Sequence, residues 1–207
     1  MRRASRIRTA IVALAVPLSL ATAGWGAEPV ADPSITHYGE INASAPSELR
    51  VFSFLVGKWG GDARVTQQDG SQKNYRVEWI GRYVLAGMAI ADEMYAADLP
   101  NRPVQGITFR SFDSRQGGWV VEFLNVTGNF LRKQVGKGYG EVRQEGKRVT
   151  ILQSGSGALL REHYDVPDQD HFTYSMDMSR DNGKTWHEAL VVMNMQRESD
   201  SSQGPGK

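Results

Sequence analysis

The sequence of 207 residues contains no cysteine. Disulfide bonds, zinc sites built on thiolates and a cysteine nucleophile are therefore excluded, and so is a lipid attached to an N-terminal cysteine. The fold must be held together by its core alone. A domain of about 150 residues can do this, because it buries roughly 68–70% of the surface that its unfolded chain exposes. The length suits one domain.

The N-terminal segment has the layout of a secretory signal peptide. Four arginines lie within the first eight residues, and an apolar run follows over residues 10–21. This run is shorter than the roughly 20 residues that a membrane-spanning helix needs. Ala21 and Ala23 are small residues at the two positions that signal peptidase recognises. We predict a signal peptide at residues 1–23, cleaved after Ala23, and a periplasmic or secreted protein; an uncleaved N-terminal anchor is the alternative.

The mature chain also lacks basic character. Removing residues 1–23 takes away four arginines and no acidic residue, which leaves 20 basic against 23 acidic side chains and a net charge of −3. A chain of this charge has no expected basic surface, so nucleic acid is not a predicted partner. Stable membrane insertion is not expected after the signal peptide has been removed.

Two stretches lack any sustained apolar period. Residues 24–46 contain three prolines among small and polar residues, and residues 198–207 are almost entirely polar. We predict that residues 24–46 form a flexible lead-in and that residues 198–207 form a disordered tail. The folded domain then covers residues 47–197.

Only one short segment has helical spacing. Ser47 is placed to cap the first turn, and Leu49, Phe52 and Leu55 follow on one helical face. Gly57 permits the chain to leave the helix. Beyond this point no stretch of useful length is amphipathic at the helical period, which argues against a fold of alternating helices and strands.

From Trp59 onward, polar and apolar residues alternate in short segments separated by glycine, Asx-Gly or proline turns. Regularly spaced short strands indicate a β-sandwich or a β-barrel. Several segments are apolar on both faces, which favours a barrel. We predict an all-β, antiparallel barrel of about eight to ten strands. The eleven candidate segments, with an alternative break at Gly87 in the third, are residues 59–67, 73–80, 83–95, 104–112, 119–126, 130–135, 139–145, 148–154, 158–166, 171–178 and 186–196.

Residues 57–59, Gly-Lys-Trp, resemble the Gly-X-Trp entry of the calycin superfamily, which includes the lipocalins. The resemblance implies a lipocalin-like barrel with a short helical turn before the first strand. It also implies that this tryptophan closes one end of the barrel and that a basic side chain after the last strand lies across its indole. Trp59 and Arg197 match these positions. A guanidinium over an indole contributes about 0.5–2 kcal/mol.

A second resemblance covers roughly residues 48–197. The Leu-Val-Gly-Lys-Trp sequence at 55–59, Gly106 ahead of Phe112-Asp113, and the segment 179–186 are similar to a bacterial family known as domain of unknown function 1579. This family is lipocalin-like and has no established activity, so the resemblance implies a fold and little else. Segment 179–186 also has the pattern of the Asp-box hairpins of sialidases, but a single copy in a short chain indicates a structural turn.

The sequence shows no catalytic constellation, and the candidate site is a ligand pocket inside the barrel. An eight-stranded barrel is about the size that holds one small ligand. Arg110 with Glu122, or Arg161 with His163, can orient a polar group of the ligand if these pairs face inward. If they face outward they are surface pairs, and a one-residue change of register decides between the two. The predicted pocket residues are Trp79, Arg110, Trp119, Glu122, His163, Met176 and Met193.

None of the four histidines has a metal-binding spacing. Some calycin barrels bind haem through a histidine near the C-terminus, and this makes His163 or His187 the candidate ligand, although the matching C-terminal motif is missing. The leading hypothesis is a barrel that binds a small apolar or amphipathic molecule and needs no cofactor. The alternatives are a haem-binding or enzymatic barrel that uses His163 or His187, and a filled structural or interaction barrel.

Overall fold

The computed structural model describes residues 38–67, 69–98, 104–125, 130–135, 140–155 and 157–199. The predicted signal peptide lies outside these residues. They form one short 3-10 helix, η1 (Ser47–Leu55), and eleven β-strands. No helix in these ranges has the length and apolar character needed to cross a lipid bilayer. The strands are β1 (Gly57–Thr66), β2 (Gln72–Val84), β3 (Ala89–Ala96), β4 (Val104–Asp113), β5 (Gly118–Asn125), β6 (Phe130–Val135), β7 (Gly140–Glu145), β8 (Arg148–Gly155), β9 (Ala158–Asp165), β10 (His171–Ser179) and β11 (His187–Arg197).

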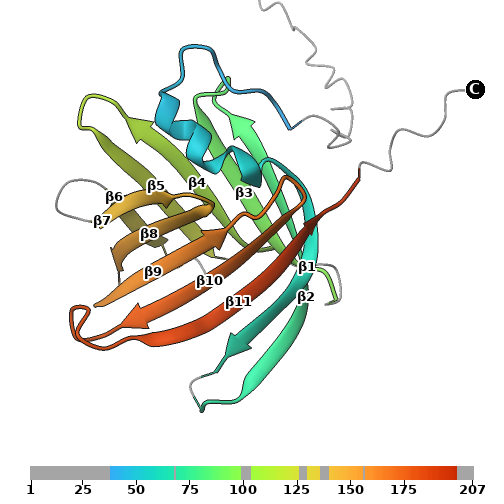
Figure 1. The fold of residues 1–207 in the computed structure, drawn as a ribbon, viewed down its shortest axis with the longest axis vertical. Coiled ribbons are helices and arrows are strands. Elements are labelled where there is room, and N and C mark those ends of the chain that lie inside the picture. The colour runs from blue at the N-terminus through green and yellow to red at the C-terminus, as the bar shows by residue number, and fades with distance from the viewer. Residues whose placement is uncertain are drawn as a thin grey trace, which may run out of the picture. The chain divides into compact units, whose positions relative to one another are not determined.

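All eleven strands belong to one antiparallel sheet, in the order β6-β5-β4-β3-β2-β1-β11-β10-β9-β8-β7. The first strand pairs with the last, and this places Trp59 opposite Arg197. The edge strands β6 and β7 contact each other, so the sheet curls into a nearly closed barrel (Figure 1). The predicted lipocalin-like, all-β barrel is confirmed.

The helix η1 lies across one end of the barrel (Figure 1). Leu49, Phe52 and Leu55 are fully buried, which confirms the helical face predicted from their spacing. The predicted cap is wrong, because Pro46 and not Ser47 precedes the helix. Ser47 is itself the first helical residue, and its hydroxyl donates to the Glu48 carboxylate at 3.3 Å instead of accepting from the helix backbone.

The strand β2 is longer than predicted, and the turn to β3 comes later. This turn covers residues 85–88, and Leu85 and Ala86 have φ angles of 51° and 53°. Residues other than glycine are uncommon in this left-handed region. Gly87, whose φ is 83°, lies in this turn, which confirms the alternative break at Gly87, whereas the strand end predicted at residue 80 comes four residues too early.

The described part of the predicted lead-in packs on this hairpin. The Tyr83 amide donates to the Tyr38 carbonyl at 2.8 Å, and the Asn42 amide donates to the Gly87 carbonyl at 3.1 Å. The Asn42 side chain adds a bond of 3.0 Å to the Ala86 carbonyl. Most of these bonds are made by backbone groups. Bonds of this kind need no pattern of apolar side chains, so the sequence does not reveal them.

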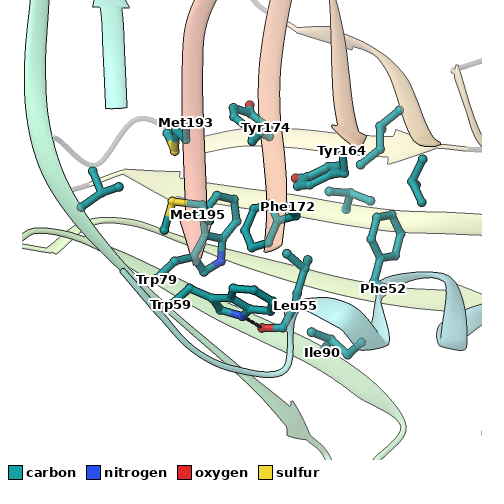
Figure 2. Packing of buried hydrophobic residues seen from close by; sticks show 14 of the residues in the cluster. Phe52, Leu55, Trp59, Trp79, Ile90, Tyr164, Phe172, Tyr174, Met193 and Met195 are labelled. Atoms are coloured by element: carbon teal, nitrogen blue, oxygen red, sulfur yellow. Dashed lines mark hydrogen bonds between the residues drawn. The ribbon is translucent and has the colours of Figure 1, made fainter. Parts of the chain in front are cut away.

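Aromatic side chains fill the barrel next to η1 (Figure 2). Phe52 meets the Trp119 ring edge-to-face at 4.9 Å, and Phe172 meets the rings of Trp59 and Trp79 at 4.7 and 5.6 Å. Each such pair contributes about 0.5–1.5 kcal/mol beyond its burial. The end of the barrel under η1 is therefore solid.

Candidate functional site

The solid end is built around Trp59, which is fully buried. Its indole N–H donates to the Leu55 carbonyl at 3.1 Å (Figure 2). The guanidinium carbon of Arg197 lies 4.1 Å from the centroid of the Trp59 ring, and burial lowers the pKa of Arg197. Nε and both terminal nitrogens of this guanidinium donate to backbone carbonyls, those of Gln169 at 2.9 Å, Val56 at 2.9 Å and Phe54 at 3.3 Å.

Gly57 explains why this arrangement begins with a glycine. Its φ angle is 127°, a conformation that residues with a side chain rarely adopt. A Cβ atom at this position would lie 2.2 Å from a terminal nitrogen of Arg197. Gly57 therefore turns the chain into β1 and leaves room for the arginine over Trp59.

Beyond the aromatic core the barrel is hollow. It contains a cavity of about 320 Å3 whose lining comes from eight strands: β2, β3, β4, β5, β8, β9, β10 and β11. Ligand sites typically have volumes of about 300–1,000 Å3 and combine apolar walls with a few placed polar groups. This cavity therefore has the size and character of a site for one small molecule. Its large apolar wall residues are Met94, Phe123, Leu160, Met176, Val191 and Met193.

A network of polar side chains crosses this cavity. Arg110 and Asp92 form an ion pair in which the two side chains are 1% and 2% exposed. The other terminal nitrogen of Arg110 donates to the Tyr164 hydroxyl at 3.1 Å. Tyr164 also interacts with the Glu162 carboxylate, which accepts a hydrogen bond from the Gln153 side-chain amide. The network joins β3, β4, β9 and β8 across the barrel.

Three buried polar atoms of the cavity wall have no hydrogen-bond partner in the described part of the chain: Trp79 Nε1, Arg110 Nε and Gln153 Oε1. About 90% or more of buried polar groups in proteins are hydrogen-bonded. An unsatisfied buried group costs about 1–3 kcal/mol. These atoms belong to residues of the cavity wall, but each has almost no accessible surface of its own, so a group in the cavity reaches them only after side chains move.

The two tyrosines of the wall are not poised for proton transfer. Burial raises the pKa of Tyr164 and of Tyr174 well above the usual value of a phenol. Catalytic acids and bases work best when their pKa lies near the working pH. Both hydroxyls stay protonated at neutral pH, so they act as hydrogen-bonding groups.

Four of the seven predicted pocket residues line the cavity, namely Trp79, Arg110, Met176 and Met193. Trp119 lies elsewhere, because it packs between Phe52 and Phe112 at the solid end, with ring distances of 4.9 and 5.5 Å. The two remaining residues, Glu122 and His163, also lie outside the cavity lining.

Strand alternation explains the positions of Glu122 and His163. Val121 and Phe123 line the cavity, and Glu122 between them faces away. His163 follows Glu162 and precedes Tyr164, which both line the cavity, so its ring is on the outer face. Arg110 therefore pairs across the cavity wall with Asp92 and not with Glu122.

His163 belongs to a polar cluster on the outer face of β8, β9 and β10. Its Nδ1 is 3.0 Å from the Thr150 hydroxyl, and its Nε2 is 3.5 Å from the Asp177 carboxylate. Arg161 donates two hydrogen bonds to Asp177, and the Ala189 amide donates a third. Burial raises the pKa of Asp177, but the bonds from Ala189 and Arg161 outweigh this and lower it.

The two candidate haem ligands do not fit a haem in the cavity. His163 faces outward, and His187 is exposed at the start of β11. None of the described histidines lines the cavity. Within the described residues, no group of three or more histidine, aspartate or glutamate side chains is arranged to hold a metal ion.

Sequence reasoning missed Asp92, Tyr164, Glu162 and Gln153. For Asp92 a signal was present, because it shares its strand face with Ile90 and Met94, both apolar. An acidic residue on an otherwise apolar face is an expected marker of a site. The other three lie on strands whose register the sequence does not set.

Comparison with solved structures supports the fold. No protein-family model matches the sequence, and no curated protein matches it. Rv2717c from M. tuberculosis is similar in structure, with a TM-score of 0.50 and 14% identity over 75% of this chain and 99% of that protein. The S-type phycobiliprotein lyase CPES from Guillardia theta has a TM-score of 0.49 and 12% identity over 74% of this chain and 94% of its own. At these identities, the likeness to Rv2717c extends to the barrel alone.

Proposed function

We propose that this chain is an exported protein that binds one small apolar or amphipathic molecule inside its barrel. The observation that carries the proposal is the cavity of about 320 Å3, with apolar walls and three unpartnered buried polar atoms. The N-terminal sequence supports export, with cleavage after Ala23. Membership of the family of domain of unknown function 1579 is part of the proposal.

Binding accounts for this site better than catalysis does. Among the described residues, the wall has one cation, Arg110, which is held in an ion pair with Asp92, and burial raises the pKa of both wall tyrosines. In a structural barrel filled with side chains, we would expect neither such a cavity nor unpartnered buried donors and acceptors, because unsatisfied buried groups cost stability.

The first test examines export and binding in one preparation. The full-length chain is expressed in a bacterial host, and the protein from the periplasmic fraction is measured by native mass spectrometry. We expect a mature chain that begins at Gly24 and carries a co-purifying small molecule or binds the neutral apolar probe N-phenyl-1-naphthylamine. A full-length chain in the cytoplasm would contradict export, and a chain that holds no small molecule and does not bind the probe would contradict the binding function.

A matched pair of variants locates the binding site. Val191 lines the cavity, whereas the next residue, Val192, does not and borders a separate outer groove. Val191→Phe places a ring in the cavity and should weaken probe binding by at least about tenfold, because the ring takes the space of the probe. Val192→Phe makes the same change on the outer face and should leave binding unchanged. Equal binding by both variants would place the probe outside the barrel.

A further inference from the structure

The charges in the cavity point to the class of molecule that it takes. The positive charge of Arg110 is matched by Asp92, and these two side chains are almost completely buried. Glu162 adds a second carboxylate to the wall. A ligand carboxylate would therefore enter a site with one guanidinium and two carboxylates, and it would lose its hydration without gaining an unpaired cation.

The unpartnered atoms add a requirement for hydrogen bonding. Within the described residues, Trp79 Nε1 and Arg110 Nε each carry a hydrogen that has no acceptor, and Gln153 Oε1 has no donor; a ligand reaches these atoms once the side chains that cover them move. A carboxylate can only accept hydrogen bonds, and an alkylammonium can only donate them. A hydroxyl or an amide does both and carries no charge.

We propose that the cavity selects neutral molecules with one polar end, such as long-chain alcohols or primary amides, and discriminates against fatty-acid anions and alkylammonium ions. The apolar chain contacts the wall formed by residues such as Met94, Phe123 and Met176, and the polar end reaches Arg110, Trp79 or Gln153. This inference rests on the proposed binding function and specifies its ligand class.

The selectivity has a defined cause in the wall. Arg110 cannot attract an anion strongly, because Asp92 lies against one terminal nitrogen while the other donates to Tyr164. Glu162 repels an anion directly, and in a site of low dielectric this repulsion is stronger than in water. Glu162→Gln removes the charge and keeps an oxygen that accepts from Gln153.

The test compares 1-decanol, decanoate and decylammonium, which share one alkyl chain, by displacement of N-phenyl-1-naphthylamine at neutral pH. We expect decanol to bind at least about tenfold more tightly than either ion, because only the ions lose charge hydration in the cavity. In Glu162→Gln, decanoate should gain about fivefold while decanol stays within about twofold. Glu122→Gln makes the same change on the outer face of β5 and should alter neither affinity.

The outcomes distinguish the ligand selectivity from the binding function. Decanoate binding as tightly as decanol, or an unchanged ratio in Glu162→Gln, would overturn the selectivity and leave the binding function intact. If the probe does not bind and neither do the three decyl compounds, the binding function itself fails, and the selectivity fails with it. The comparison of ligands on the unmodified protein requires no variant, so a folding defect in Glu162→Gln would not block it.

Discussion

Two arginines of the barrel, the partly exposed Arg197 and the fully buried Arg110, differ in how completely they are bonded. Arg197 lies over Trp59 at the solid end, and Nε and both terminal nitrogens donate to backbone carbonyls. Arg110 lies at the hollow end, 5.2 Å from the centroid of the Phe52 ring. Its terminal nitrogens are paired with Asp92 and Tyr164, but its Nε has no partner.

This difference separates a structural residue from a binding residue. The guanidinium of Arg197 is satisfied by the chain itself and ties the end of β11 to the segment before β1. The guanidinium of Arg110 is held in an ion pair, belongs to the cavity wall and keeps one donor, Nε, without a partner in the described part of the chain. Arg197 is also more exposed, at 31% against 1% for Arg110, but the hydrogen bonds identify which guanidinium is satisfied by the chain.

The largest expected effect comes from emptying the solid end. Trp59→Ala removes a fully buried indole and the ring beneath Arg197, and it should lower the free energy of unfolding by about 3–5 kcal/mol. Urea unfolding followed by circular dichroism measures this loss. A loss below about 1 kcal/mol would mean that this end is not the stabilising part of the barrel.

The next effect concerns the ion pair in the cavity. Arg110→Met leaves Asp92 buried without its cation and should cost about 3 kcal/mol. The double variant Arg110→Met with Asp92→Leu removes both charges and should recover most of that stability. The same urea experiment measures both variants. A double variant as unstable as the single one would show that the cost lies in lost packing and not in the unpaired carboxylate.

Replacing the other arginine should affect stability but not binding. Arg197→Met loses the contact with the Trp59 ring and three hydrogen bonds at a partly exposed position, and we expect a cost of about 2 kcal/mol. Affinity for N-phenyl-1-naphthylamine should stay within about twofold, because the side chain is not part of the cavity wall. A loss of affinity as large as that of Val191→Phe would remove the distinction between the two ends.

The smallest expected effect lies at the hairpin between β10 and β11, outside both ends. The Asp181 carboxylate accepts from the Thr185 hydroxyl at 2.6 Å and from the Thr185 amide at 2.9 Å, and these bonds lower its pKa from 3.8 to about 2. The folded-state pKa is below the unfolded one, so this contribution is present above pH 3.8 and is lost as the pH falls through about 2. Asp181→Asn should therefore flatten the decline in urea stability over this pH window. If the stability of Asp181→Asn fell as steeply with pH as that of the unmodified protein, the bonds of the Asp181 carboxylate would not be the cause of the decline.

The closure of the solid end by Trp59 and Arg197 followed from the Gly-X-Trp resemblance, whereas Trp119 of the same end was predicted in the pocket. The signals of that resemblance are local, because the apolar face of η1, Gly57 and Trp59 lie within residues 49–59, and Arg197 directly follows the final apolar strand segment. The all-β architecture also followed from short alternating segments, although the sheet has eleven strands where about eight to ten were predicted. The break at Gly87 was offered by the sequence, but the left-handed conformations of Leu85 and Ala86 were not, because those side chains carry no marker of them.

The hollow end was predicted only in part, because it depends on register between distant strands. Asp92, Arg110, Tyr164 and Gln153 come from four strands, and a shift of one residue in any of them would turn its side chain to the outer face. The same uncertainty put Glu122 and His163 among the pocket residues. The volume of the cavity is a property of all the walls together, and no single segment of the sequence encodes it.

The most direct measurement of the central claim compares two indole N–H groups in one nitrogen-15 NMR spectrum. Trp79 lines the cavity and its Nε1 has no partner among the described residues, whereas Trp59 Nε1 donates to the Leu55 carbonyl at 3.1 Å. We expect the Trp79 signal, assigned with Trp79→Phe, to move in proportion to saturation when 1-decanol is added, and the Trp59 signal to stay in place. A saturating titration that leaves Trp79 unmoved, or moves Trp59 as far, would contradict the account of a solid end and a hollow, ligand-binding end.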